Sequence, residues 1–463
     1  MSRYSGVVFT DYETLPWLGV YGGEVARLQE KGLKAIGVRL SKVNVPSNTT
    51  VGANLFGFSK LIGLRSDELH TPKFQRRDSL GKLTEMTTPM HAALDAQLRG
   101  SFRQTHGYPA KAKDKLLRGG LGVLATLASL KNHHRIAEVS IPNGRLFYHK
   151  LIEAWAQNEG FQIRYTEVPI FDPSNTSYFL EEFSVHNRTE IHSKYLRAQA
   201  PDHSSLVAEN DWFASRQSST GDNKFLRAQR GANEKLSPRV GVRTVSLFTS
   251  SPDEFLGLEK GGWECEWEDQ YRGFEEFLLR LRGPHTVFLR LHPNLANKSF
   301  VEYEIETRRA FDLQKKFPSL TILGPSSGVN SYDLIKMSDL AVVSQSTIGL
   351  EAVAMGVPTI SVMPNTWDLY LGAPRLHAKS DTLELEALPE AHPERAPVYL
   401  HYQHALNQGK RKSFGRVVTR TLSTPIMSTP SRLKGAFLGR RFVLGVEIAA
   451  NKFRGRFISR GAS

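Results

Sequence analysis

Strand-like and helix-like segments alternate without a break between residues 242 and 362, and this alternation constrains the fold more than any other feature. Each short apolar run is followed by a segment whose apolar residues recur with the period of an α-helix. The expected elements are strand 242–248, helix 269–282, strand 286–291, helix 300–317, strand 320–323, helix 331–337, strand 340–343, helix 348–355 and strand 359–362. Strands that alternate with helices in this way predict a doubly wound, parallel sheet.

The early part of the chain follows the same pattern less regularly. The expected elements are strand 6–10, helix 24–31, strand 34–40, strand 136–141, helix 146–158 and strand 161–168. Gly19, Gly22 and Gly23 are expected in the turn between the first strand and the first helix. The polar stretch 41–118 has no clear periodicity, and we assign no elements to it.

The length of 463 residues is too great for one ordinary hydrophobic core. Segment 215–238 is low in apolar periodicity, so we expect a domain boundary there. We therefore predict an α/β fold in which two Rossmann-like domains face a cleft, with an N-terminal domain over 1–235 and a C-terminal domain over 236–400. A basic C-terminal extension is expected over 401–463.

The net charge of +14 is concentrated in this extension. Residues 405–463 hold 13 lysines and arginines but one acidic residue, Glu447, so 12 of the 14 net positive charges lie there. The nearly neutral remainder and the lack of a recognisable nucleic-acid-binding module disfavour nucleic acid as a partner. Within 432–460, phenylalanine, leucine and valine are interleaved with arginine and lysine, which is typical of a helix on an anionic membrane. A disordered basic tail is the alternative.

Other features of the sequence predict a cytoplasmic protein. Cys265 is the single cysteine, so no internal disulfide can form. No apolar run of about 18 residues is present, so no membrane-spanning helix is expected. Residues 1–11 lack the basic and apolar segments of a cleaved signal peptide. We expect a cytoplasmic location, with peripheral attachment to the inner face of the plasma membrane through the extension.

Three polar junctions follow strands of the second half, where sheets of this type bind ligands. The first junction, 248–254, places Thr249, Ser250, Ser251 and Glu254 after an apolar strand. Their hydroxyl groups and the free amides there are suited to an anion or a sugar hydroxyl. The same residues form a capping box with proline at the first helical position, so an ordinary helix start explains them equally well.

The second junction follows the strand 286–291 and contains Arg290, His292 and Asn294. A residue that precedes proline is held extended, so His292 is expected to project from the strand tip. A single histidine is usually structural, but one in this position is a better candidate ligand than most.

The third junction gathers Ser344, Ser346 and Thr347 where a strand gives way to a helix. Backbone amides without partners and the helix dipole favour a phosphate group at such a point. Glu351 lies one turn further along, where it could accept hydrogen bonds from ribose hydroxyls. An ordinary helix cap is the alternative for any one junction, but three polar junctions on one sheet edge favour a ligand site.

Five segments carry a resemblance to a known family. They are 143–145, 249–254, 290–294, 331–332 and 346–351, which lie in this order within residues 136–364. Together they resemble bacterial capsular-polysaccharide glycosyltransferases of the two-domain GT-B type. The resemblance implies that His292, Ser346 and Thr347 contact the donor phosphates and that Glu351 holds the ribose. The first 130 residues match this family poorly, which leaves the identity of the acceptor open.

The resemblance implies a transferase that moves a sugar from a nucleotide-sugar donor to a growing cell-surface (capsular-type) polysaccharide or a lipid-linked glycan. It also implies inversion at the sugar, which requires a general base for the acceptor hydroxyl. The base is expected at a strand end of the first domain, and the candidates are Asp11, Glu24 and Glu167. Asn143 and Arg145 are expected to shape the acceptor side.

No metal or other cofactor is expected. The sequence contains no Asp-x-Asp motif of the metal-dependent transferases and no ligand spacing typical of zinc. Helix amides and the side chains of His292 or Arg290 would then stabilise the leaving group. Two other functions stay open: a sugar-nucleotide 2-epimerase with the same architecture, and a non-catalytic protein of polysaccharide assembly.

Overall fold

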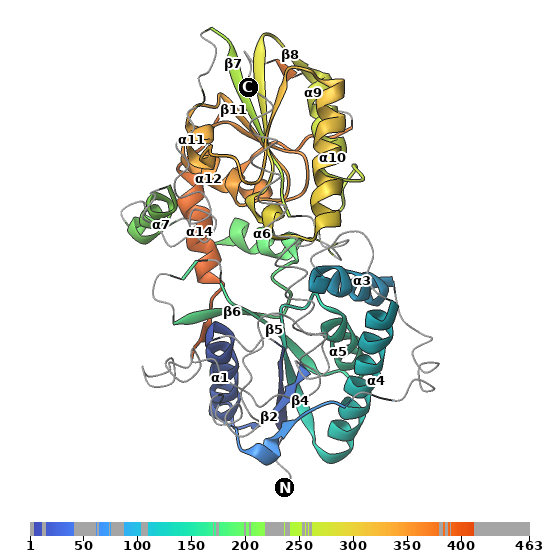
Figure 1. Cartoon of the computed structure of the whole chain (residues 1–463). Coiled ribbons are helices and arrows are strands. Elements are labelled where there is room, and N and C mark those ends of the chain that lie inside the picture. Colours follow the sequence, from blue (N-terminus) through green and yellow to red (C-terminus); the bar gives the residue numbers. More distant parts are fainter. Residues whose placement is uncertain are drawn as a thin grey trace.

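The computed structural model contains two α/β domains stacked one above the other (Figure 1). The residues that it describes are 4–11, 15–40, 62, 64–73, 75, 88–102, 110–169, 171–172, 176–198, 201–202, 205–217, 236, 241–251, 255, 258, 262–378, 383–384, 388 and 390–411. Within these residues no helix combines the length and the apolar character needed to cross a membrane.

The first domain is built on a seven-stranded sheet with the order β14-β6-β5-β4-β1-β2-β3. Its strands are β1 (Ser5–Thr10), β2 (Lys34–Arg39), β3 (Leu69–His70), β4 (Ile136–Pro142), β5 (Gln162–Glu167), β6 (Ser177–Glu181) and β14 (Gly409–Lys410). Strands β1 to β5 are parallel, whereas β6 pairs in antiparallel fashion with both β5 and β14. β1 is buried along its whole length, as parallel strands covered on both faces require.

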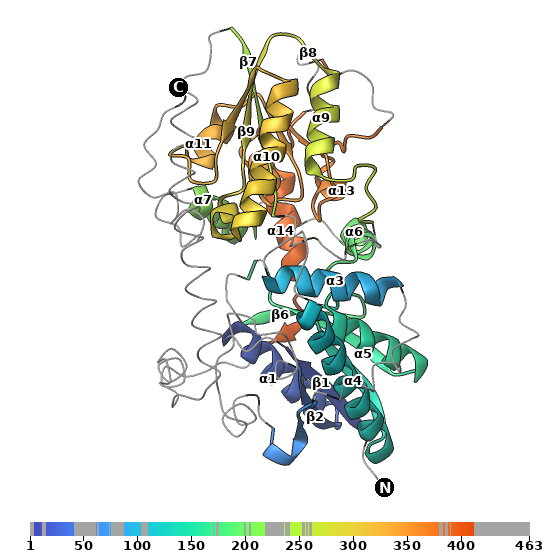
Figure 2. The ribbon, with the colours of Figure 1, turned by 45° about the vertical axis from the view of Figure 1, so that its right-hand side comes forward.

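Helices cover both faces of this sheet, as Figure 2 shows. On one side lies α1 (Leu15–Glu30). On the other side lie α3 (Thr88–Phe102), α4 (Ala110–His133) and α5 (Phe147–Asn158).

The second domain is built on a five-stranded parallel sheet with the order β10-β9-β7-β11-β12. Its strands are β7 (Arg243–Phe248), β9 (His285–Arg290), β10 (Leu320–Leu323), β11 (Leu340–Val343) and β12 (Thr359–Ser361). Its covering helices are α9 (Gln270–Arg280), α10 (Phe300–Lys316), α11 (Ser331–Lys336) and α12 (Ile348–Ala354). The short strands β8 (Leu281–Arg282) and β13 (Leu383–Glu384) form a separate pair.

Both sheets share one topology. Numbered along the chain, the five parallel strands of each domain run in the order 3-2-1-4-5, which is the Rossmann arrangement. The predicted α/β fold with two Rossmann-like domains is therefore confirmed. In such sheets the strand order reverses between strands 1 and 4, and ligands bind beyond the carboxyl ends at that point. The reversal falls between β1 and β4 in the first domain and between β7 and β11 in the second.

Four of the described helices pack against one another where the chain passes between the two domains. They are α6 (Arg188–Arg197), α7 (Val207–Gln217), α13 (Asp368–Leu371) and α14 (Arg395–Ala405). Tyr195 of α6 packs against Tyr370, Tyr399 and Tyr402 of α13 and α14, with ring centroids 5.5–5.6 Å apart. After α14 the chain returns to the first domain, where β14 pairs with β6. The chain therefore passes between the domains more than once.

One local prediction is wrong. Helix α1 begins at Leu15, so Gly19, Gly22 and Gly23 lie inside the helix rather than in the turn before it. The reason is close packing: a Cβ atom on Gly23 would lie 2.1 Å from the carbonyl oxygen of Lys410 in β14. The predicted extension lies outside the described residues from position 412 onward.

Candidate active site between the two domains

The three predicted junctions of the second domain converge at the carboxyl end of its sheet. Thr249, Ser250 and Ser251 follow β7, and their side chains are buried. Thr249 Oγ1 accepts a hydrogen bond of 2.7 Å from the backbone amide of His292, which follows β9. The hydroxyl oxygens of Ser250 and Ser344 are 3.2 Å apart, so the loop after β7 also contacts the loop after β11. The three predicted junctions therefore lie next to one another in the structure.

His292 and Asn294 lie at the start of a short 3-10 helix, Pro293–Asn297. The ring atom Nδ1 of His292 accepts a hydrogen bond of 3.1 Å from the backbone amide of Asn294. A niche of about 10 Å³ separates this histidine from the loop after β7, which is room for a single water molecule. The niche is lined by Thr249, Ser250, Ser251, His292, Leu295, Lys298, Glu302 and Glu306.

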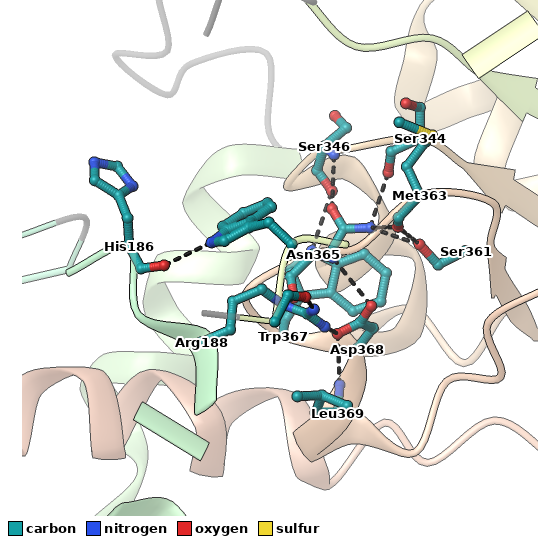
Figure 3. A network of polar contacts seen from close by, with 12 residues as sticks. His186, Arg188, Ser344, Ser346, Ser361, Met363, Asn365, Trp367, Asp368 and Leu369 are labelled. Carbon is teal, nitrogen blue, oxygen red and sulfur yellow. Dashed lines mark hydrogen bonds and ion pairs between the residues drawn. The ribbon is translucent and has the colours of Figure 1, made fainter. Parts of the chain in front are cut away.

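The turn at residues 344–347 is held from below by side chains of the next loop (Figure 3). Asn365 accepts a 2.9 Å hydrogen bond from the amide of Ser346 and donates one of 2.9 Å to the carbonyl of Ser344. The indole nitrogen of Trp367 donates to the carbonyl oxygen of Ser346 over 3.2 Å. Because these bonds engage the main chain of the turn, they fix its path. Ser346 and Thr347 line a cavity, and the hydroxyl oxygen of Ser346 accepts a hydrogen bond of 3.3 Å from the backbone amide of Ile348.

A buried arginine connects this loop to the first domain. Arg188, the first residue of α6, forms an ion pair with Asp368 and donates a hydrogen bond of 2.5 Å to the carbonyl oxygen of Asn365. Both charged side chains are 2% exposed. Trp263 donates from its indole nitrogen to the carbonyl oxygen of His186 over 2.6 Å. The segment before α6 is thus attached to the loop that supports the 344–347 turn, as Figure 3 shows.

Glu167 ends β5 and lines the cavity from the first domain. Its Oε2 accepts a hydrogen bond of 2.5 Å from the side-chain amide of Asn143, and its Oε1 accepts one of 2.9 Å from the amide of Val168. Burial raises the pKa of Glu167 to about 7, although Asn143, Val168 and the nearby charge of Arg145 act in the opposite direction. A carboxyl group with such a pKa can take up a proton near neutral pH.

The cavity between the domains has a volume of about 310 Å³. Glu167 and His186 contribute from the first domain, and Ser346, Thr347 and Asn365 from the second. The remaining lining residues are Val168, Pro169, Phe179, Val185, Phe255, Leu258, Trp263, Gln345, Thr366, Trp367, Gln403 and Asn407. A site of this size, with apolar walls and few polar groups, is typical of a small-molecule site.

Glu24, another candidate base, lies elsewhere. Its side chain is fully buried beneath the first sheet. Its two carboxylate oxygens accept hydrogen bonds from Ser140, Tyr178 and, through two nitrogens, Arg27. Four donors saturate a carboxylate. These contacts place Glu24 in the core of the first domain rather than at the cavity.

Two other predicted site residues are buried close to the sheet. Asp11, after β1, lies 3.2 Å from Nε2 of His149, and both side chains are nearly inaccessible. Arg290 donates to the carbonyl oxygen of Gly324 over 2.5 Å and lies 3.4 Å from the hydroxyl of Ser331. Burial lowers the pKa of Arg290 to about 10. Neither Asp11 nor Arg290 lines the cavity.

Glu351 is buried in a contact between helices. One carboxylate oxygen accepts a hydrogen bond of 2.6 Å from Arg216 of α7, and the other accepts one of 2.5 Å from the hydroxyl of Tyr332 of α11. Glu254 lies outside the described residues. Among the residues that the structure does describe, no group of three or more His, Cys, Asp or Glu side chains is arranged to hold a metal ion.

Sequence reasoning missed five residues that build the site. Asn365, Trp367 and Asp368 follow β12, so the rule that ligands lie at strand ends would have found them had it been applied to one more strand. His186 and Arg188 lie between β6 and α6 in a segment without apolar periodicity. Their roles depend on contacts more than 40 positions away in sequence, which no local pattern indicates.

No family model matches the chain, and no curated protein matches it in sequence. Several solved structures are similar in fold. The beta Kdo 2,7 transferase KpsC of Thermosulfurimonas dismutans is 14% identical, covers 65% of this chain and 85% of its own, and gives a TM-score of 0.36. The UDP-GlcNAc 2-epimerase of Methanocaldococcus jannaschii is 11% identical, covers 91% of this chain and 99% of its own, and gives a TM-score of 0.27. The spinosyn rhamnosyltransferase SpnG is 10% identical, covers 91% of this chain and 100% of its own, and gives a TM-score of 0.26.

Proposed function

We propose that the chain is a glycosyltransferase that moves a sugar from a nucleotide-sugar donor to a glycan acceptor. One observation carries the proposal: Glu167, the one carboxylate among the described residues that line the cavity, shares that cavity with Ser346 and Thr347 of the opposite domain. A candidate base and a candidate phosphate site therefore meet where two Rossmann-like domains face each other.

In the proposed reaction, an acceptor hydroxyl oxygen bonds to the anomeric carbon of the donor sugar. The bond from that carbon to the phosphate oxygen breaks, and its electron pair stays with the nucleotide phosphate. The hydroxyl proton passes to Glu167, whose pKa of about 7 suits proton uptake near neutral pH. A single direct displacement inverts the configuration of the sugar.

The leaving phosphate would lie at the 344–347 turn. The hydroxyl groups of Ser346 and Thr347 line the cavity, and the amino end of α12 adds a partial positive charge. The adjoining loops after β7 and β9, which carry Ser250 and His292, would offer further donors to the same nucleotide. Glu351 is not assigned to the ribose, because its carboxylate already connects α12 to α7 and α11.

The cavity favours transfer over the 2-epimerase alternative. An epimerase must remove and return protons on the sugar ring itself, which requires more than one acid or base around the ring. Among the described lining residues, Glu167 and His186 are the ionisable ones, and burial lowers the pKa of His186 to about 3. His186 is therefore neutral and a poor base, so one base remains, as transfer to an acceptor hydroxyl requires.

The finer proposal is a capsular-type polysaccharide or lipid-linked glycan as acceptor, supported by the sequence resemblance in segments such as 143–145 and 346–351. Transfer without a metal ion is part of the same proposal, because hydroxyl groups and helix amides would stabilise the leaving phosphate.

The test is a screen of the purified full chain against CMP-, UDP-, GDP- and dTDP-sugars, with and without EDTA. We expect one nucleotide class to raise the melting temperature and to be consumed when a glycan acceptor is added, with no effect of EDTA. Replacing Ser346 by Ala should weaken the thermal shift, whereas E167Q should keep the shift and lose the transfer. A folded protein that responds to none of these donors would contradict the proposal.

A further inference from the structure

We propose that Asn143 and His186 are positioning residues, and that together they form a hydrogen-bonded relay that holds the Glu167 carboxyl group toward the cavity in its proton-accepting form. The inference rests on the proposed role of Glu167 as the base. It is drawn from three contacts that connect β4, β5 and the segment before α6.

The backbone of Asn143 has a conformation that few residues adopt. Its φ angle is 60°, and among the described residues it is the one non-glycine residue with positive φ. Asparagine tolerates this region better than most residues, and such strain tends to occur at functional sites. Two hydrogen bonds stabilise this conformation. The backbone amide of Asn143 donates to the carbonyl oxygen of Thr166 over 2.7 Å, and the carbonyl oxygen of Asn143 accepts from the hydroxyl of Ser184 over 2.7 Å. The side chain of Asn143 is thereby directed at Glu167.

The side-chain amide of Asn143 has its orientation set by its neighbours. Its Nδ2 donates to Glu167 Oε2 over 2.5 Å. Its Oδ1 accepts from the backbone amide of Arg145 over 3.3 Å and lies 3.1 Å from Nε2 of His186. A carbonyl oxygen can only accept, so Nε2 of His186 must carry the hydrogen atom. This hydrogen assignment follows from the network of contacts.

His186 keeps that hydrogen at every physiological pH. Burial, with the charges of Arg145, Lys150 and the neighbouring His149, lowers the pKa of the ring to about 3, so the ring stays neutral. Within the described part of the chain, the other charged group that acts on Glu167 is Arg145, which precedes α5. From the second domain, the described lining residues contribute no ionisable side chain. The relay therefore donates to Glu167 without titrating itself, and it favours the ionised carboxylate against the effect of burial.

The experiment measures the protonation of Glu167 through stability, without any need for a substrate. Because the pKa of Glu167 is raised from 4.5 to about 7 on folding, its proton is held more tightly in the folded protein. Wild type should therefore lose melting temperature relative to E167Q as the pH rises from about 4.5, and the difference should level off above about 7. The midpoint of this difference lies halfway between the unfolded and the folded pKa of Glu167, so it moves by half of any change in the folded pKa.

The same comparison is then made with Asn143 replaced by Gly, which keeps the positive φ and removes only the amide side chain. We expect the folded pKa of Glu167 to rise by about one unit, the size expected for a lost hydrogen bond to a charged group, and the midpoint to rise by about half a pH unit. H186L should raise it as well, whereas H186Q, which supplies an N–H group at a similar reach, should restore it. Asn407→Ala removes an amide from the same cavity and should leave the midpoint unchanged.

A midpoint that is the same in N143G as in wild type would overturn the relay, and so would equal behaviour of H186L and H186Q. Should N143G not fold, the two His186 variants carry the test. Failure of the proposed function gives a different result: E167Q would then retain full transfer, whatever the stability data show. Once a donor is known, the acidic limb of the pH–rate profile should move with the stability midpoint in each variant.

Discussion

The two sides of the cavity are built from different chemistry. On the side of the second domain, the described lining residues carry no ionisable side chain, and the 344–347 turn is fixed by hydrogen bonds between its main chain and the side chains of Asn365 and Trp367. The side contributed by the first domain carries an ionisable group, Glu167, which is held by the side chain of Asn143. A departing phosphate needs fixed dipoles, whereas an acceptor hydroxyl needs a group that takes a proton. This difference supports the proposal that the donor binds on the side of the second domain and that the base belongs to the first.

Two carboxylates of the first domain, the buried Glu24 and the partly buried Glu167, also differ in their surroundings. Glu24 accepts four hydrogen bonds, and the positive charge of Arg27 lies beside it. Glu167 accepts two, from Asn143 and Val168, and its pKa rises to about 7. A saturated carboxylate stabilises a fold, whereas one with a remaining lone pair in a cavity can act on a ligand.

The largest effect is expected for E167Q. Removing the base should lower the rate of sugar transfer by about 10²–10⁴-fold. Stability at pH 8 should not fall, because the variant removes a charge that burial destabilises. Initial rates and melting temperatures measure both effects.

A matched control for this variant is Glu182→Gln. Glu182 is 64% exposed and pairs with Arg164 on the surface of the same domain. Its replacement should leave transfer unchanged. If both variants lost the same fraction of the transfer rate, the effect of E167Q would not be specific to the cavity, and the base would not belong to the side of the first domain.

The next largest effect is expected for Arg188→Met. The change leaves Asp368 buried without its charged partner, which typically costs about 3–5 kcal/mol. It also frees the loop that supports the 344–347 turn, so donor binding should weaken as well. Denaturant unfolding measures the first effect and donor titration the second. A stable variant with unchanged donor affinity would show that the domains do not depend on this contact.

Asn365→Ala should affect the donor side selectively. Asn365 supports the amide of Ser346 and the carbonyl of Ser344, and loss of buried hydrogen bonds costs about 1–3 kcal/mol. We expect KM for the donor to rise by about ten- to a hundredfold with little change in kcat. A fall in kcat at constant KM would instead place the turn at the reacting bond.

The smallest effect is expected for Lys131→Met. Lys131 and Glu159 form an ion pair of 2.7 Å on the surface, with the lysine side chain 52% exposed. Exposed pairs contribute at most about 1 kcal/mol, and salt screens them. Urea unfolding at two salt concentrations measures the difference. A large loss of unfolding free energy would mean that this exposed ion pair stabilises the fold as much as the buried pair of Arg188 and Asp368 does.

Much of the second domain could be predicted from sequence. Its parallel strands are continuous apolar runs separated by amphipathic helices, so each of the nine predicted elements lies within two residues of its observed limits, whereas the short elements β8, α13 and β13 were not predicted. The hydroxyl groups of Ser250 and Ser344 were expected on one sheet edge, and they lie 3.2 Å apart.

The first domain was less predictable for physical reasons. Helix α4 contains Gly120 and Gly122, which weaken a helical pattern, yet both are required by close packing. A Cβ atom on Gly122 would lie 2.1 Å from the carbonyl oxygen of Lys73. The choice among Asp11, Glu24 and Glu167 depended on burial and on partners distant in sequence, which strand-end position alone does not reveal.

The most direct test of the central claim is a crystal structure of E167Q with the nucleotide sugar that the donor screen identifies. We expect the phosphate next to the sugar to contact Ser346 and Thr347, and the anomeric carbon to face residue 167 across the cavity. A phosphate bound away from the 344–347 turn, or a sugar directed away from residue 167, would contradict it.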